Sequence, residues 1–275
     1  MRVPFEVLAE GLNHPEGVAW NPADGRVYAG GEEGEIYAAS MDGDVEELCA
    51  TGGSMLGLAI DGCGRVYACD SGNGDVVRWD PATGRIMSYA GGGALDTPNA
   101  MAFAPDGALY VTCSGEEGDP VIVRIAPGGE AERWCEALSA YPNGCCVTPD
   151  GSALLVVESH RPGVSRVPIL PDRAPGDPVT VAELPDTDPD GVALAEDGSM
   201  FVTLYRPDGI LRIAADGSVT TAVDDHLAQT FDAPTNIAFV GPRLERAVVA
   251  NVGDRFLSIG DLGIRGQPLH YPEVP

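Results

Sequence analysis

The chain has 275 residues, 44% of them hydrophobic, with 36 glycines and 23 prolines, which suits one large domain of strands and tight turns. Its formal charge is −26, and all 16 basic residues are arginine. A surface this acidic repels phosphate backbones and anionic lipids, so we expect neither nucleic acid nor a membrane as partner. The lack of lysine also excludes Schiff-base chemistry.

Targeting signals are not apparent. The N-terminus lacks a long apolar run behind a basic start, and no stretch reaches the roughly 20 apolar residues of a membrane helix. The seven cysteines form no C-x-x-C pair and no zinc-type cluster with histidine. We therefore expect a cytoplasmic protein with reduced, mostly buried cysteines, present as a monomer or a small homo-oligomer.

Six similar units follow one another along the chain. They begin at Pro15, Met55, Pro98, Pro142, Pro189 and Pro234, at spacings of 40, 43, 44, 47 and 45 residues. Each has a short apolar strand, a turn and a second strand rich in Val, Tyr, Leu and Phe. The turns are Asp24-Gly25, Gly62-Cys63-Gly64, Asp106-Gly107, Asp150-Gly151, Asp197-Gly198 and Gly241-Pro242. The Asp-Gly pairs tolerate positive φ and therefore predict tight hairpins.

A third strand follows in every unit, and a weaker fourth in most, such as residues 44–50. The third strands are expected at 34–40, 75–81, 121–127, 163–169, 209–215 and 255–261. Three to four strands in about 44 residues predict the blades of a six-bladed β-propeller, one all-β domain over residues 1–275. A parallel β-helix would have shorter repeats. Residues 4–10 or 268–271 could close the ring, and we favour the N-terminal segment.

Polar residues recur where the first strand of each unit begins. In a propeller these strands line one channel, so equivalent positions converge on its axis. The six residues are Glu16, Leu56, Asn99, Asn143, Asp190 and Thr235, with Asn236 as a spare polar group. Confined carboxylates repel each other and lose hydration, and a cation relieves both costs.

The predicted metal ligands are Glu16, Asn99, Asn143 and Asp190, which offer oxygen atoms only. This donor set suits Ca²⁺ best, with Mg²⁺, Mn²⁺ or, less well matched, Zn²⁺ as alternatives. The alternative to a metal site is that these polar groups cap the ends of strands and bind water in the channel.

The loops between second and third strands should surround the same channel mouth. From these loops and the approach to the channel we assign five residues to substrate binding: Tyr205, Arg206, Arg161, His160 and His14. Arginines beside a metal pocket suit a carboxylate or similarly polar substrate, although ion pairs with neighbouring acids explain any one of them equally well. The two histidines could transfer protons or be plain loop residues.

Familiar catalytic motifs are absent from the sequence. There is no G-x-S-x-G nucleophile elbow, no phosphate loop and no H-E-x-x-H. Any hydrolysis would therefore depend on the metal.

The chain resembles the gluconolactonase/regucalcin (senescence marker protein) family of six-bladed propellers and, more distantly, paraoxonases and diisopropylfluorophosphatase. The resemblance covers all six units, and its motifs are PEGVAW at 15–20, PNAMAFAPDG at 98–107, PNGCCVTPDG at 142–151 and DPDGVALAEDG at 188–198. It implies that Glu16, Asn143 and Asp190 ligate a divalent ion. It also implies that Asn99 contacts the ion, the substrate or a water molecule, and that Asp190 is the general base.

Two departures from that family concern the substrate. Sugar-lactone members carry Arg-x-Asn-Asp where this chain has Thr97-Pro98-Asn99-Ala100, and Glu-Gly-Pro where it has Glu16-Gly17-Val18. The resemblance thus supports the metal site more than an aldonolactone substrate.

We expect a metal-dependent hydrolase that opens a lactone ring, with Asp190 and Asn99 as catalytic residues. One alternative keeps the metal site for another ester or phosphotriester, or for enolising or rearranging a substrate. A second alternative is a non-catalytic propeller that binds a ligand or a protein and carries a structural metal.

Overall fold

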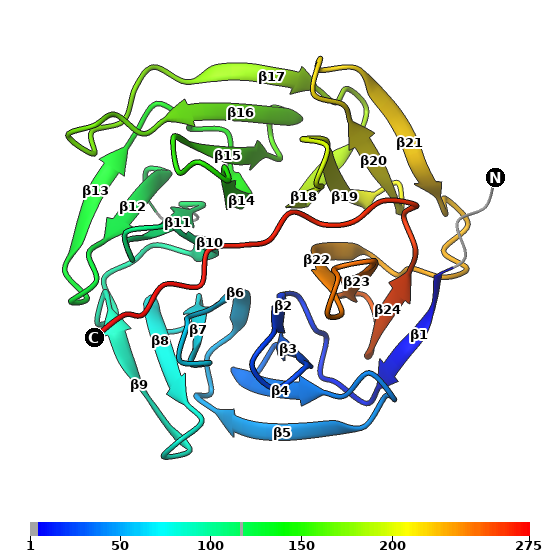
Figure 1. Ribbon diagram of the computed structural model, residues 1–275, viewed down its shortest axis with the longest axis horizontal. Helices are drawn as coiled ribbons and strands as arrows, with labels where there is room; N and C mark the ends of the chain where they lie inside the picture. The colour runs from blue at the N-terminus through cyan, green and yellow to red at the C-terminus, as the bar shows by residue number, and fades with distance from the viewer. Residues whose placement is uncertain (1–4, 116–117) are drawn as a thin grey trace.

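The computed structural model describes residues 5–115 and 118–275, which form 24 strands in six four-stranded antiparallel sheets. The sheets are arranged like blades around a central axis (Figure 1). The all-β, six-bladed propeller predicted from the repeats is therefore confirmed. No helix able to cross a membrane occurs within these two described segments.

The first five blades each use four consecutive strands, ordered from the channel outwards. Blades one to three comprise β2 (Val18–Asn21), β3 (Arg26–Gly30), β4 (Glu35–Ala39) and β5 (Val45–Ala50); β6 (Met55–Ile60), β7 (Val66–Asp70), β8 (Asp75–Asp80) and β9 (Arg85–Ala90); β10 (Pro98–Phe103), β11 (Leu109–Cys113), β12 (Val121–Ile125) and β13 (Ala131–Cys135). Blades four and five comprise β14 (Pro142–Val147), β15 (Ala153–Glu158), β16 (Gly163–Pro168) and β17 (Val179–Glu183); β18 (Asp188–Leu194), β19 (Met200–Arg206), β20 (Gly209–Ile213) and β21 (Val219–Asp224).

The sixth blade joins the two ends of the chain. It contains β22 (Pro234–Val240), β23 (Arg246–Asn251), β24 (Phe256–Gly260) and, as its outer strand, β1 (Phe5–Glu10). β1 pairs antiparallel with β24, and the ring of Phe5 packs edge-on against Phe231 at 5.1 Å between centroids. Closure by the N-terminal segment is thus confirmed, although Pro4 lies outside the described residues.

The hairpin turns also satisfy buried hydroxyl groups. Tyr28 and Tyr67 occupy the same position in the second strands of their blades and are fully buried. The hydroxyl of Tyr28 donates to Asp24 Oδ2 at 2.7 Å, and that of Tyr67 donates to Asp61 Oδ2 at 3.1 Å. The acidic residue of each turn therefore lets a large aromatic side chain enter the core without an unpaired polar atom.

Neighbouring inner strands approach one another closely around the channel. A Cβ atom on Gly57 would lie 2.7 Å from the Cα of Ala100, and one on Gly191 would lie 2.6 Å from the carbonyl oxygen of Thr235. Only glycine fits at such contacts. The glycine that follows the polar residue in several units therefore allows the inner strands to bring those polar residues together.

Residues 262–275, here named the C-terminal strap, run across one end of the channel (Figure 1, red). The Gln267 N–H donates to the carbonyl of Leu194 at 2.9 Å, and the Gly62 N–H donates to that of Pro272 at 2.8 Å. The strap includes residues 268–271, which the sequence offered as a second candidate for closing the ring. They cross the channel instead of adding a strand to a blade.

Candidate functional site

The four side chains predicted to hold a metal meet at one end of the channel. Glu16 precedes β2, and Asn99, Asn143 and Asp190 lie near the starts of β10, β14 and β18. All four line one pocket of about 400 Å³. Glu16 and Asn99 also line a second pocket of about 820 Å³, so two of the four candidates border this larger space as well.

Glu16 and Asp190 place two carboxyl groups in this confined space. Burial and the negative charge of Asp190 raise the pKa of Glu16. Burial also raises the pKa of Asp190, although a hydrogen bond from the Asn143 side chain acts in the opposite direction. Both shifts mean that the charged forms are disfavoured unless a positive charge lies nearby.

Three oxygens in the set have no hydrogen-bond partner among the described residues. They are Oδ1 of Asn99, Oδ1 of Asn143 and Oδ1 of Asp190. All three residues are buried. Buried oxygens without a donor are costly, and carboxylate and amide oxygens are the ligands that Ca²⁺ prefers. The residues present therefore fit a hard divalent cation.

The amides are needed for that fit. Over residues 5–115 and 118–275, no three His, Cys, Asp or Glu side chains gather closely enough to hold a metal by themselves. The four candidate ligands at the channel mouth are two carboxylates and two amides, whose oxygen atoms would be the ligands.

The other two positions of the ring do not add ligands. Leu56 lines the larger pocket as an apolar wall, and the Thr235 hydroxyl donates to the Glu16 carbonyl at 2.8 Å. Asn236, the spare ligand of the sequence prediction, lines a pocket at the opposite end of the channel. The structure does not bring it to the four candidate ligands.

Two of the predicted substrate-binding residues line the ligand pocket. His160 and Tyr205 border it together with the four candidate ligands. The His160 ring also packs on Tyr141, with 4.7 Å between the ring centroids. Tyr141 borders both pockets, which makes it a substrate-contact candidate that the sequence analysis missed.

His14 and the two arginines are engaged by the protein. Nδ1 of His14 donates to the carbonyl of Val252 at 2.9 Å. Arg161 Nη2 donates to both carboxylate oxygens of Glu158, and Arg206 Nη1 donates to Asp208 Oδ1 at 2.6 Å. None of the three predicted residues lines either pocket at this mouth.

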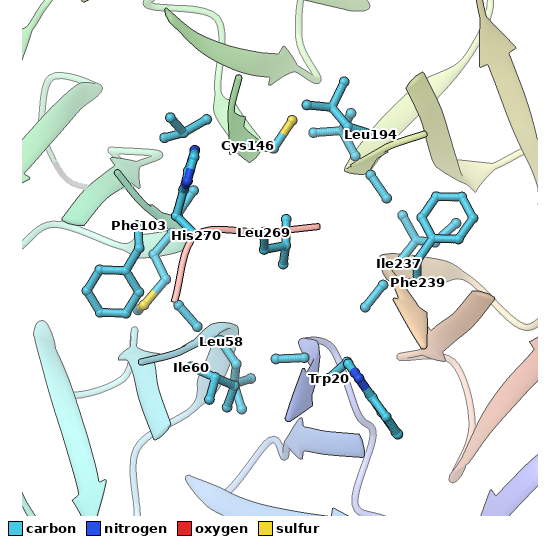
Figure 2. A pocket seen from close by; sticks show the side chains of 18 of the residues that line it. Trp20, Leu58, Ile60, Phe103, Cys146, Leu194, Ile237, Phe239, Leu269 and His270 are labelled. Carbon is cyan, nitrogen blue, oxygen red and sulfur yellow. The ribbon is translucent and has the colours of Figure 1, made fainter. Parts of the chain in front are cut away.

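The opposite end of the channel is apolar. Figure 2 shows Trp20, Leu58, Ile60, Phe103, Cys146, Leu194, Ile237 and Phe239 around a pocket that Leu269 and His270 of the C-terminal strap also line. This pocket has a volume of about 100 Å³. Burial raises the pKa of the Cys145 and Cys146 thiols on its wall, which suits packing residues better than nucleophiles. The polar chemistry of the channel thus lies at the other end.

Comparison with known proteins identifies relatives of this architecture. Residues 85–252, more than half of the chain, match the family model described as SMP-30/Gluconolactonase/LRE-like region. A gluconolactonase of Zymomonas mobilis is 27% identical over 120 residues, which cover 38% of this chain and 33% of that protein. The chain thus spans about a third of the length of this curated relative.

Two solved structures share the fold. A gluconolactonase from Xanthomonas campestris superposes with a TM-score of 0.81 and 22% identity, covering 94% of this chain and 89% of its own. A calcium-binding protein, regucalcin from Agrobacterium tumefaciens, superposes with a TM-score of 0.80 and 20% identity, covering 100% and 98%. At these identities the likeness concerns the fold, while the family match rests on the sequence. The chain therefore belongs to the SMP-30/gluconolactonase/LRE-like family.

Proposed function

We propose that this protein is a metal-dependent hydrolase that opens a lactone ring at the four-residue site. The observation that carries the proposal is the set of three buried, unpaired oxygens that share a pocket with Glu16. Membership of a gluconolactonase-like family supports the reaction class. The calcium-binding regucalcin among the structural neighbours supports Ca²⁺ as the ion to test first.

Glu16, Asn99, Asn143 and Asp190 would hold the ion. When bound, a divalent cation polarises the lactone carbonyl and stabilises the oxyanion that develops on it. A carboxylate oxygen of Asp190 would accept a proton from the attacking water as the water oxygen bonds to the lactone carbonyl carbon, and would return that proton to the ring oxygen as the ring C–O bond breaks.

Asn99 would orient the water molecule or the ion. Its Nδ2 donates to Ser114, whereas its Oδ1, a hydrogen-bond acceptor, has no partner among the described residues. An acceptor can hold a water molecule or a cation, whereas a lactone carbonyl needs a donor. His160, Tyr205 and Tyr141, which line the same pocket, would contact the substrate.

The test combines metal analysis with a pH-indicator assay over a lactone panel, with and without chelator. We expect one divalent ion per chain and turnover that chelator abolishes. Asp190→Asn should fold but lose most turnover, while Asp186→Asn is a matched control. Asp186 is exposed and has a positive φ of 61°, a backbone conformation that asparagine tolerates.

Two outcomes would contradict the proposal. Turnover that survives chelator would exclude the metal-dependent mechanism. Bound metal without turnover of lactones, aryl esters or phosphotriesters would instead favour a binding propeller with a structural metal.

A further inference from the structure

The amide groups of Asn99 and Asn143 are held by two chains of hydrogen bonds with the same design. Asn99 Nδ2 donates to Ser114 Oγ at 3.1 Å, and Ser114 Oγ donates to the Pro142 carbonyl at 2.9 Å. Ser114 directly follows β11, the second strand of the blade that carries Asn99. The accepting carbonyl belongs to the next blade and immediately precedes Asn143.

The same chain is repeated one blade further on. Asn143 Nδ2 donates to Ser159 Oγ at 3.1 Å, and Ser159 Oγ donates to the Pro189 carbonyl at 2.7 Å. That carbonyl precedes Asp190. Three of the four candidate ligands are thus connected through two serine hydroxyls and two peptide groups.

The serine proton determines which way each amide faces. A hydroxyl has one proton, and in both serines it is donated to a carbonyl, which can only accept. The serine oxygen must therefore accept from the asparagine, which requires the NH₂ end of the amide. Oδ1 of Asn99 and Oδ1 of Asn143 are left facing away from the serines, and both lack a partner among the described residues.

We propose that Ser114 and Ser159 are positioning residues that fix these two Oδ1 atoms toward a divalent cation. The inference rests on the metal site of the proposed function. An asparagine amide is ambiguous as a ligand because a half-turn about its last bond exchanges the oxygen for an NH₂ group. NH₂ hydrogens directed at a cation would repel it, so a fixed orientation raises the affinity for the ion.

A third chain in the sixth blade shows the same orientation with a partner present. Asn251 Nδ2 donates to Ser258 Oγ at 3.0 Å, and Ser258 Oγ donates to the Thr230 carbonyl at 3.0 Å. There, Oδ1 accepts the backbone N–H of Asp232 at 3.0 Å. This unit lies outside both pockets at the mouth, and it provides a matched control for substitutions in the other two.

The experiment measures calcium binding by titration calorimetry on full-length protein first stripped with chelator. We expect Ser114→Ala and Ser159→Ala each to raise the Kd by about 10- to 100-fold, the usual cost of losing a group that orients a ligand. Ser258→Ala removes the same chemical group and should leave the Kd unchanged. Ser114→Thr retains a hydroxyl and should restore most of the affinity. Thermal unfolding of each variant checks folding, and Ser159→Ala tests the idea independently if Ser114→Ala does not fold.

The outcomes separate this inference from the proposed function. Calcium binding by the wild type with unchanged Kd in Ser114→Ala and Ser159→Ala overturns the positioning role and leaves the metal site standing. A rise in Kd of equal size in Ser258→Ala also overturns it, because the effect would then be general. A wild type that binds none of Ca²⁺, Mg²⁺ and Mn²⁺ overturns the metal site and the positioning role together.

Discussion

Gly144 lies directly against the main-chain carbonyl of Asp190 in the neighbouring blade, and a Cβ atom on Gly144 would overlap that oxygen. Such an atom would also lie 2.7 Å from the Cα of Gly191. The inner strands β14 and β18 therefore touch through their backbones beside the candidate metal ligands. The position of the Asp190 carboxylate consequently depends on the absence of a side chain in another blade.

Gly144→Ala should displace β18 and with it Asp190. Overpacking of this kind costs about 1–3 kcal/mol of unfolding free energy. We also expect weaker calcium binding, because one ligand moves relative to the others. Urea denaturation and calorimetry would measure both effects. Gly128→Ala is the control, since no atom lies within 4 Å of its added Cβ. Calcium binding by Gly144→Ala that equals the wild type would show that β18 tolerates the displacement.

Glu16→Gln removes one of the two carboxylates that repel each other in the pocket. A pKa shift of one unit corresponds to about 1.4 kcal/mol, so we expect the metal-free variant to be roughly 1–3 kcal/mol more stable than the metal-free wild type. Calcium at about 100 times the wild-type Kd should stabilise the wild type by about 2.7 kcal/mol and the variant far less.

Denaturation with and without calcium measures both effects of Glu16→Gln. Glu183→Gln, on the exposed outer strand β17, is the control for the loss of one negative charge. A metal-free Glu16→Gln protein less stable than the wild type would argue against repulsion at the site.

The pH dependence of stability should also reveal the two neighbouring carboxyl groups of Glu16 and Asp190. In the metal-free protein, Glu16 and Asp190 have folded-state pKa values above their ordinary ones. At pH values between the unfolded-state and the folded-state pKa values of these two groups, the folded state binds more protons than the unfolded state. The free energy of unfolding therefore falls as pH rises. We expect this loss from about pH 5 to pH 8, and a shallower one in Glu16→Gln.

Saturating calcium should flatten or reverse that slope, because ligating carboxylates are deprotonated. Denaturation at a series of pH values, with chelator or with calcium, provides the measurement. A metal-free wild type whose stability rises from about pH 5 to pH 8 would be inconsistent with raised pKa values for Glu16 and Asp190.

Arg161 has a partner within the protein. Its side chain is 65% exposed, whereas the side chain of Glu158, with which it pairs, is 2% exposed. Arg161→Gln leaves that buried charge without its cation, so we expect a loss of about 1–2 kcal/mol, reduced by solvent around the arginine. kcat/KM should change less than about threefold. Arg133→Gln breaks the exposed pair with Glu136 and is the control. A large rise in KM without loss of stability would instead support the predicted role in substrate binding.

The propeller could be predicted because the six similar units can be recognised in the sequence. Each blade repeats an apolar strand, a tight turn and a second strand, and four of the six turns are Asp-Gly. Gly107 and Gly151 in these turns have the positive φ that the Asp-Gly pairs predict. The register of the repeat also identified the candidate ligands, since one position per blade must face the axis. Asn236 is one residue past Thr235, the position of the sixth blade in this register, and it lines the pocket at the other end of the channel.

The supporting residues of the site could not be predicted in the same way. Ser114 and Ser159 follow their asparagines by 15 and 16 residues, a spacing that is visible once the role is known. Their role depends on which group each hydroxyl proton reaches in the next blade, and that contact leaves no pattern in the sequence. The path of the C-terminal strap was missed because it makes isolated contacts, such as the bridge between Ala195 and Gly266, and no regular strand.

The C-terminal strap covers the end of the channel opposite the four candidate ligands. With apolar side chains and residues 262–275 obstructing the far end, a molecule that enters beside Glu16 cannot leave by passing through the ring. In the proposed hydrolysis, substrate and product would therefore use the same opening, and the product would have to leave before the next substrate could bind.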